Sequence, residues 1–388
     1  MDPTGPETMS VSAHPYRLQA ILDAAVAGQA PDDGEIRFLL TVNDEADRRR
    51  LYAAARTVRS RFFGRGVFTY GFVYFSTYCR NDCLFCHYRK SNTALHRYRK
   101  SISEIIETAR AMAAAGAHLV DLTMGEWPGM TWSEGGVSLD FPGLARAVKK
   151  ACGLPLMVSP GVAAEETLAE LGRIGAEWYA CYQETHNRRL FAQLRSGQDY
   201  DRRMAAKQNA RRSGMLIEEG ILIGVGESTD DIADSVQAMR ELDADQVRVM
   251  TFVPQKGTPM EDRTTTAGVR EEVVIAVLRL ALPDRLIPAS LDVGGLAGLR
   301  DRLDAGANVV TSIVLPGNGF AGVANKVLDI DESRRTPQAI LPVLEACGLT
   351  IADRADYQRY IERRRGRGIA EAAPLHRTDT KMRAVGTA

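Results

Sequence analysis

The chain has 388 residues, 45% of them hydrophobic, and carries 49 basic and 49 acidic side chains. This balance argues against nucleic acid or a membrane surface as the main partner. No apolar run approaches the roughly 20 residues that span a bilayer, and residues 1–13 lack the apolar centre of a signal peptide. The length suits one α/β barrel of about 250 residues with extensions.

Apolar runs typical of β-strands alternate with helical patterns along the chain. The expected strands are Val67–Phe75, His118–Thr123, Leu156–Ser159, Trp178–Tyr182, Leu216–Ile223, Gln246–Phe252, Leu286–Ser290 and Val309–Ile313. The expected helices between them include Ile102–Ala115, Ala163–Ile174, Tyr200–Ser213, Thr229–Leu242 and Val269–Leu282. Eight such units in succession predict a closed (β/α)8 barrel of the TIM type rather than a doubly wound sheet.

The predicted domain organisation has four parts. Residues 1–15 are expected to be a flexible N-terminus, 16–60 a helical extension packed outside the barrel, 61–360 the barrel, and 361–388 a flexible C-terminal tail. The basic run that begins at Arg363 has nucleic-acid binding as an alternative role. Its terminal position favours a solvated tail.

Three cysteines, Cys79, Cys83 and Cys86, directly follow the first expected strand with the spacing C-x3-C-x2-C. Three thiolates on one loop can hold three irons of a [4Fe–4S] cluster and leave the fourth iron without a protein ligand. That iron can chelate the amino and carboxylate groups of S-adenosylmethionine, and an electron from the cluster then cleaves it to a 5′-deoxyadenosyl radical. The spacing therefore predicts both cofactors.

Zinc is the alternative reading of this motif. A structural zinc normally takes four ligands in paired spacings, and His87, which directly follows Cys86, has poor geometry for the fourth. A non-enzymatic metal-binding module is the corresponding alternative function. An exposed, oxygen-sensitive cluster requires a reducing compartment, so we expect a cytoplasmic protein.

Polar residues recur where the expected strands end. They are Asp121 near the end of the second strand and Glu126 after it, Ser159 at the end of the third, Glu184 after the fourth, Arg248 on the sixth, Ser290 at the end of the seventh and Asp292 after it. The non-polar candidates Met124 and Gly125 lie in the turn after the second strand, and Gly224 and Val225 follow the fifth. Any one charged residue here could form a barrel salt bridge. Their recurrence at the C-terminal ends of successive strands favours an active site.

The cysteine loop, the Met124-Gly-Glu126 turn and the segment from Gly220 to Glu227 resemble the radical S-adenosylmethionine superfamily, in the branch that holds biotin synthase and a hydrogenase maturase. More narrowly, the chain resembles the 3-methylornithine synthase family of the pyrrolysine pathway. The stretches that carry this likeness are Tyr74–Cys79, His118–Glu126, Tyr182–Thr185, Val247–Phe252, Leu286–Asp292 and Asn308–Ile313. The resemblance extends from about Tyr52 to Tyr357, and His87 departs from the tyrosine expected after the third cysteine.

The resemblance implies a role for each matching residue. Met124, Gly125 and Glu126 would receive the methionine amino end of the cofactor, Gly224 and Val225 would pass its adenine, and Glu184, Arg203, Arg195 and Ser159 would contact it elsewhere. Asp121, Arg248, Ser290 and Asp292 match the amino-acid-binding residues of the family. One arginine for a carboxylate and two aspartates for ammonium groups suit a diamino acid.

The implied activity is the isomerisation of L-lysine to 3-methylornithine by fragmentation and recombination across the Cα–Cβ bond, with a flavodoxin or ferredoxin as reductant. Biotin synthase would need ligands for a second cluster, for which Cys152, Cys181 and Cys347 are a poor set. A hydrogenase maturase shares the fold and the cofactor, but its pocket should not need the combination of Asp121, Arg248 and Asp292.

Overall fold

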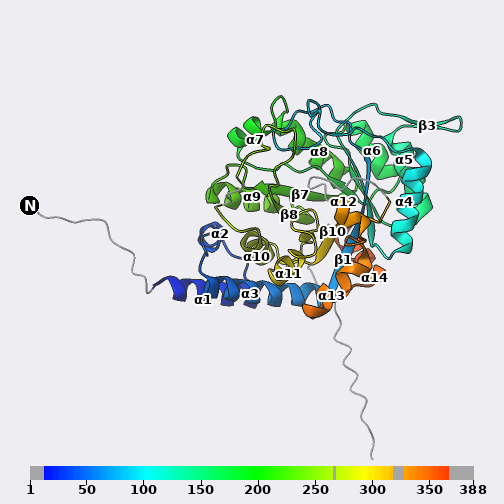
Figure 1. The fold of residues 1–388 in the computed structure, drawn as a ribbon. Helices are drawn as coiled ribbons and strands as arrows, with labels where there is room; N and C mark the ends of the chain where they lie inside the picture. The colour runs from blue at the N-terminus through cyan, green and yellow to red at the C-terminus, as the bar shows by residue number, and fades with distance from the viewer. Residues whose placement is uncertain (1–12, 265–267, 318–326, 367–388) are drawn as a thin grey trace, which may run out of the picture.

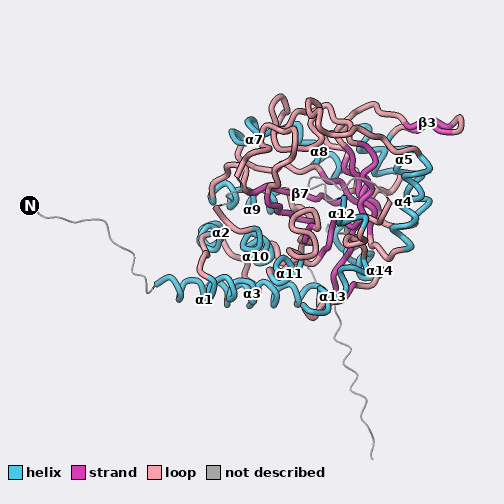
Figure 2. Tube along the Cα trace, in the orientation of Figure 1, coloured by secondary structure: helices cyan, strands magenta, loops and turns pink. Residues whose placement is uncertain are grey.

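The computed structural model describes residues 13–264, 268–317 and 327–366. Its centre is a ring of eight parallel strands surrounded by helices (Figures 1 and 2). The strands, in chain order, are β1 (Gly66–Ser76), β2 (Leu119–Met124), β5 (Leu156–Ser159), β6 (Trp178–Ala180), β7 (Leu216–Ile223), β8 (Gln246–Thr251), β9 (Pro288–Ser290) and β10 (Val309–Ile313). The expected barrel is therefore confirmed, with small shifts at strand ends.

Two contacts complete the ring. β1 pairs in parallel with β10, with Phe68 opposite Val309. At the other seam, the backbone N–H of Val247 donates to the carbonyl of Leu286 at 2.9 Å, which joins β8 to the residues just before β9. All strands point the same way, so their C-terminal ends share one mouth of the barrel.

Helices cover the outside of the ring. They are α4 (Ile102–Ala114), α5 (Phe141–Cys152), α6 (Glu165–Arg173), α7 (Arg188–Leu194), α8 (Tyr200–Arg212), α9 (Thr229–Glu241), α10 (Glu271–Ala281), α11 (Leu299–Asp304), α12 (Val327–Asp331) and α13 (Pro337–Ala346). Ser101 and Glu104 form a reciprocal capping box at the start of α4, as the sequence predicts. Of these helices, α5, α7, α11, α12 and α13 were not among the sequence predictions.

A short hairpin, β3 (Trp132–Glu134) with β4 (Val137–Leu139), projects from the side of the molecule (Figures 1 and 2). The hairpin was not predicted from the sequence, because its strands of three residues each are too short to contain an apolar run. A two-residue strand, β11 (Thr350–Ile351), adds to the start of β1.

Three helices precede the barrel: α1 (Ala13–Ala27), α2 (Asp33–Leu40) and α3 (Glu45–Phe63). α1 and α3 lie along the outside of the barrel (Figure 1). The buried Arg59 of α3 donates to the carbonyl of Leu303 at 2.6 Å and fixes the extension to the segment that leads into β10. The expected flexible segment 1–15 lies outside the described residues except for its last three, which begin α1.

The predicted C-terminal tail begins at residue 361, which lies inside a helix in the structure. Helix α14 runs from Arg354 to Arg365, and its Ile361 and Arg364 are buried. The buried carboxylate of Asp245 accepts an ion pair from Arg364, which explains how an arginine-rich segment stays folded against the barrel. The rest of the tail, 367–388, lies outside the described residues.

α14 covers the N-terminal end of the barrel. Tyr357 donates from its hydroxyl to that of Tyr70 on β1 at 2.7 Å, and Tyr360 stacks parallel to Trp178 with ring centroids 6.4 Å apart. The helix therefore covers one end of the barrel, opposite the mouth at the C-terminal strand ends. Within the described ranges, none of the helices has both the length and the apolar character needed to cross a membrane.

Candidate active site

A cavity of about 210 Å³ opens at the C-terminal ends of the strands. The side chains that border it come from the cysteine loop and from the ends of most strands around the ring. Of the residues predicted from sequence, its lining includes Cys79, Cys83, Cys86, Asp121, Met124, Gly125, Glu126, Ser159, Glu184, Arg195, Arg203, Arg248 and Asp292. Distant parts of the chain are thus brought together as predicted.

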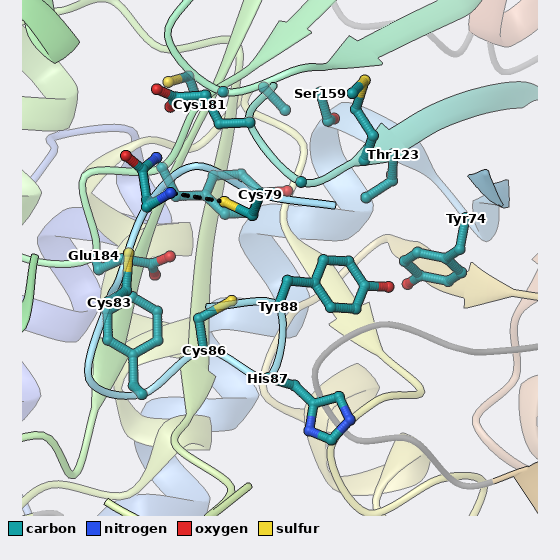
Figure 3. Close-up of a pocket in the computed structure, with 18 of the residues that line it drawn as sticks. Tyr74, Cys79, Cys83, Cys86, His87, Tyr88, Thr123, Ser159, Cys181 and Glu184 are labelled. Carbon is teal, nitrogen blue, oxygen red and sulfur yellow. Dashed lines mark hydrogen bonds between the residues drawn. The ribbon is translucent and has the colours of Figure 1, made fainter. Parts of the chain in front are cut away.

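The cysteine loop leaves the end of β1 and folds over one side of the cavity (Figure 3). The turn at Gly125 lies so close to it that a Cβ atom at this position would stand 2.3 Å from the carbonyl oxygen of Tyr78 and 2.8 Å from Cβ of Cys79. Only glycine allows this approach. The turn after β2 and the first cysteine therefore hold one another in place.

The three thiols border a space rather than meet at a point. In Figure 3 their sulfur atoms lie around the cavity, and the ring of His87 points away from the sulfur of Cys86. In the part of the chain that the structure describes, no group of three or more His, Cys, Asp or Glu side chains converges enough to hold a single metal ion. Such spread thiols suit a multi-iron cluster better than a zinc ion.

In the absence of a bound metal, the surroundings of the thiols disfavour the thiolate form. Burial, followed by the neighbouring Cys83 and Cys79, raises the pKa of the Cys86 thiol well above its usual range. Burial also raises the pKa of Cys79. A bound cation removes this penalty because it stabilises the thiolates directly.

Glu184 presents a buried acceptor to the cavity. Its Oε1 accepts from Arg195 at 2.9 Å, while its Oε2 has no hydrogen-bond partner among the described side chains and backbone groups. Burial raises the pKa of Glu184. The residue also has a left-handed backbone, with φ of 69°, in a bridge to Ile221 that fixes its direction.

Two arginines flank this carboxylate. Arg203 donates from Nε to the carbonyl of Tyr182 at 2.7 Å, and its buried Nη1 has no hydrogen-bond partner in the described structure. Arg195 contacts the same carbonyl at 3.1 Å and lies 3.5 Å from the sulfur of Cys83. This corner of the cavity therefore offers both an acceptor and a cationic donor beside the cysteine loop.

The Glu126 carboxylate is engaged by protein groups. Arg80 donates to its Oε1 at 2.8 and 2.7 Å, and the backbone N–H of Val162 donates to its Oε2 at 2.9 Å. The Glu126 side chain thus ties the cysteine loop to the segment after β5. What the turn presents to the cavity is the backbone and the Met124 side chain, which agrees with a turn that receives a ligand.

Asp121 lies at the buried end of the cavity and accepts from Ser159 at 2.8 Å. Burial, and then the nearby Glu218 carboxylate, raises the pKa of Asp121 to about 7. Ser159, predicted as a cofactor contact, is therefore also bound to a predicted substrate residue. The residues predicted to bind the cofactor and those predicted to bind the substrate are therefore in contact here.

Arg248 is buried and forms an ion pair with Glu218, a residue that was not singled out from the sequence. Its Nε donates to Glu218 at 2.7 Å and its Nη1 to Thr311 at 3.2 Å, whereas Nη2 has no hydrogen-bond partner among the described groups. Arg248 therefore enters the cavity as one half of an ion pair with one donor nitrogen unused.

Asp292 is also paired. Arg335, which the sequence analysis did not single out, donates to its Oδ1 at 2.6 Å, and Ser312 donates to its Oδ2 at 2.8 Å. Ser312 has a φ of 63°, a strained value for serine. Ser290 contacts Ser312 at 3.2 Å and lies behind Asp292 instead of lining the cavity.

Gly224 and Val225 do not line the cavity either. Their backbone N–H groups donate to the carboxylate of Glu227 at 2.7 and 2.9 Å, and the Val225 side chain packs in the same apolar cluster as Cys83 and Phe85. In this structure the segment supports the cysteine loop from behind.

Tyr88 is a further residue that the sequence analysis missed. It leaves the cysteine loop two positions after Cys86 and extends toward Tyr74 on the other side of the cavity (Figure 3). Its buried hydroxyl has no hydrogen-bond partner in the described part of the chain. Because the Tyr74 hydroxyl lies 3.4 Å from Asp292, the Tyr88 ring extends from the cysteine loop toward the Asp292 side of the cavity.

Comparisons with known proteins agree with this geometry. Residues 73–239 match the radical SAM superfamily model. The chain is 43% identical to 3-methylornithine synthase of Methanosarcina barkeri over 336 residues, which cover 87% of this chain and 95% of that protein. The chain belongs to the 3-methylornithine synthase family. The corresponding protein of Methanosarcina acetivorans is 42% identical and covers 86% of this chain and 94% of its own length.

A crystal structure of methylornithine synthase (PylB) superposes with a TM-score of 0.82 at 42% identity and covers 88% of this chain and 99% of that chain. The hydrogenase maturase HydG shares the fold, with a TM-score of 0.73 at 18% identity over 88% of this chain and 78% of that one. Members of the 3-methylornithine synthase family are radical S-adenosylmethionine enzymes, and the family brings a [4Fe–4S] cluster and S-adenosylmethionine as cofactors.

The residues present fit both cofactors. The spread thiols of the cysteine loop suit the cluster. Beside them, Oε2 of Glu184 and Nη1 of Arg203 are buried and make no hydrogen bond among the described groups, although Nη1 lies 3.6 Å from the Glu126 carboxylate, and a cofactor with ammonium, carboxylate and hydroxyl groups would satisfy both atoms. The other cysteines do not form a second site. Cys181 lines the cavity, whereas Cys152 ends α5 and Cys347 caps α13.

Proposed function

We propose that this enzyme converts L-lysine into 3-methylornithine. The observation that carries the proposal is that one cavity joins the cysteine loop to a carboxylate, Asp121, and to two ion pairs, Arg248 with Glu218 and Arg335 with Asp292. A cavity for a neutral substrate would have no use for these buried charges, which are expensive to desolvate.

The charges at this end of the cavity match a diamino acid. Three carboxylates, on Asp121, Glu218 and Asp292, face two guanidinium groups, on Arg248 and Arg335, and leave one negative charge in excess when Asp121 is ionised. L-Lysine carries one positive charge in excess at neutral pH. The free substrate and the cavity therefore complement each other in net charge.

Each residue has a role in this proposal. The unused Nη2 of Arg248 donates to the substrate carboxylate, and Asp121 accepts from an ammonium group. Asp292, held by Arg335 and Ser312, receives the second ammonium group. Glu184 and Arg203 hold S-adenosylmethionine, and Tyr88 and the barrel wall retain the substrate fragments and exclude water.

When bound and reduced, the cluster and S-adenosylmethionine supply the 5′-deoxyadenosyl radical that removes hydrogen from the substrate. With that hydrogen taken from Cγ, the Cα–Cβ bond would break and Cα would rejoin the former Cγ. The methylene radical left at the former Cβ would take a hydrogen atom back from 5′-deoxyadenosine, so that the product has the mass of lysine. The reaction needs a one-electron reductant such as a flavodoxin or ferredoxin. Because the cluster is sensitive to oxygen, we expect the enzyme to act in the cytoplasm.

The test uses anaerobically reconstituted enzyme with S-adenosylmethionine, dithionite and either L-lysine, L-ornithine or L-norleucine, followed by mass spectrometry. We expect an isomer of unchanged mass from lysine and little turnover of norleucine, which lacks the ε-amine. Arg248→Lys should lose about tenfold to a hundredfold in turnover, because an ammonium group cannot replace a donor fork that also holds Glu218. Robust turnover of norleucine, or a lysine product of altered mass, would reject the assignment.

A further inference from the structure

Two exposed aromatic side chains meet on the surface beside the cysteine loop. Among the described residues, five large hydrophobic side chains are exposed, and two of these, Tyr78 at 39% and Trp127 at 44%, lie in edge-to-face contact with ring centroids 6.2 Å apart. Tyr78 directly precedes Cys79, and Trp127 directly follows Glu126. The pair therefore marks the outer side of the structure that holds the first cluster ligand.

The surface around this pair is basic. Residues 77–100 carry six lysine and arginine side chains and one acidic side chain, Asp82, in a chain whose total charge is balanced. Lys90 and Arg99 are exposed, and so is Arg80 despite its ion pair with Glu126. Asp82 is bound to Arg89 at 2.9 Å, so it does not offset the exposed charges as a free carboxylate would.

Hydrogen bonds to backbone carbonyls hold together the chain segments that carry these side chains. The backbone of Lys90 donates to the carbonyl of Asn81 at 2.8 Å, and Arg99 donates to the carbonyl of Thr131, in the loop that begins at Trp127, at 3.0 Å. We call the exposed set Tyr78, Arg80, Lys90, Arg99 and Trp127 the cluster-loop face. Acidic residues lie beyond its border, since Asp140 and Glu166 line the groove on the other side of Trp127.

We propose that the cluster-loop face is the docking site of a small, acidic one-electron carrier protein. The inference rests on the proposed function, which needs one electron delivered to the cluster for each cleavage of S-adenosylmethionine. In the step, the carrier loses one electron and the cluster gains it, and no bond forms or breaks in the protein.

The chemistry of the face suits this partner. Protein interfaces are enriched in tyrosine, tryptophan and arginine, and electron-transfer complexes are small, so a compact aromatic centre with a basic rim is sufficient. A positive surface attracts a negatively charged carrier and raises the rate of encounter. Docking here places the carrier next to the residue before Cys79, close to the site that must be reduced.

The experiment compares two reductants on the same reconstituted holoenzyme. Dithionite is a small ion and needs no docking surface, whereas reduced flavodoxin must form a complex. We would measure 5′-deoxyadenosine formation with each for Trp127→Ser and Lys90→Glu. We expect the flavodoxin KM to rise about tenfold or more for each variant, with the wild-type rate falling as salt increases and dithionite-driven rates unchanged.

Two control variants match the changes in chemistry. Tyr16→Ser removes an aromatic side chain that is 80% exposed on α1, and Lys150→Glu reverses an exposed charge in the last turn of α5, at the end of the barrel opposite the cavity. Neither should alter the flavodoxin KM.

Three outcomes would overturn the proposal: equal losses with both reductants, unchanged flavodoxin kinetics in Trp127→Ser and Lys90→Glu, or a face covered by a second copy of the chain in the reconstituted enzyme. Because the readout is cofactor cleavage, it does not depend on which amino acid is the substrate. A failure of the lysine assignment would therefore be seen separately.

Discussion

The guanidinium of Arg335 donates to the carboxylate of Asp292 at 2.6 Å inside the barrel, with both side chains buried. Arg335 lies just before α13, whereas Asp292 follows β9. A residue near the end of the chain therefore neutralises one of the carboxylates proposed to bind substrate. Without it, Asp292 would be a buried charge with only hydroxyl partners.

Replacing Arg335 should impair substrate use more than cofactor cleavage. In Arg335→Gln the cavity gains negative charge and Asp292 loses its anchor, so lysine turnover should fall at least tenfold while uncoupled formation of 5′-deoxyadenosine persists. Arg335→Lys should recover part of the turnover. Rates of both products and the melting temperature check this, and a parallel loss of both activities with a lower melting temperature would indicate a purely structural role.

The three loop cysteines should be essential for the cluster, and the others should not. Cys83→Ala should abolish reductive cleavage of S-adenosylmethionine, because one iron loses its ligand. Cys152→Ala and Cys347→Ala, outside the cavity, should keep it. Iron content, the absorption spectrum and 5′-deoxyadenosine formation test this. Normal cleavage of S-adenosylmethionine by Cys83→Ala would contradict the assignment of the three cysteines as cluster ligands.

Substitutions of cofactor-binding residues should weaken cofactor affinity, whereas substitutions of substrate-binding residues should not. Glu184→Gln and Arg203→Gln should weaken S-adenosylmethionine binding by about tenfold or more, since each removes a charge-assisted contact. Ser290→Ala and Asp292→Asn should leave cofactor affinity unchanged and impair lysine turnover. Equilibrium binding of S-adenosylmethionine to reconstituted enzyme measures the first effect, and similar losses in all four variants would contradict the division.

Substrate binding should improve as pH rises through neutrality. Burial raises the pKa of Asp121 to about 7 in the structure without substrate, so the carboxyl is mostly protonated at pH 6 and mostly ionised at pH 8. Only the ionised form attracts an ammonium group, so the lysine KM should fall about tenfold between these values. Asp121→Asn should bind lysine weakly at both, and a KM in the wild type that does not vary with pH would argue against the role.

Helix α14 should contribute strongly to stability. Arg364→Ala leaves the buried Asp245 carboxylate with one fewer cationic partner, and removing one member of a buried pair costs roughly 3–5 kcal/mol. Arg359→Ala, which removes an exposed partner of Asp356, should cost less than about 1 kcal/mol. Urea denaturation of both variants measures the difference, and equal stability would indicate that the segment from residue 361 behaves as the flexible tail expected from the sequence.

The alternation of apolar strands and helices was sufficient to predict the barrel, because strands buried on both faces read as continuous apolar runs. The cysteine spacing, together with the polar residues at strand ends, located the cavity. The short helices and the β3–β4 hairpin were missed, since they have weak periodicity.

Partners within the cavity were harder to predict than the cavity itself. Glu218 was visible as a carboxylate in an apolar strand, and Thr311 and Ser312 lay in a stretch already compared with the family. Arg335 gave no local signal, because its role depends on the path of the chain after β10. Pairing across the barrel is a tertiary property, so a salt bridge was an open alternative for Arg248 and Asp292, but the sequence did not reveal the partner of either.

The pairing of β1 with β10 and β11, and the covering of the barrel's base by α14, have a consequence for how the protein is made. The first strand remains without one of its neighbours until more than 300 residues have left the ribosome, and its buried tyrosine meets Tyr357 later still. The cysteine loop is synthesised early, long before the walls around it can form. The nascent loop therefore stays open to solvent until β9 and β10, the strands that complete the ring, have been made.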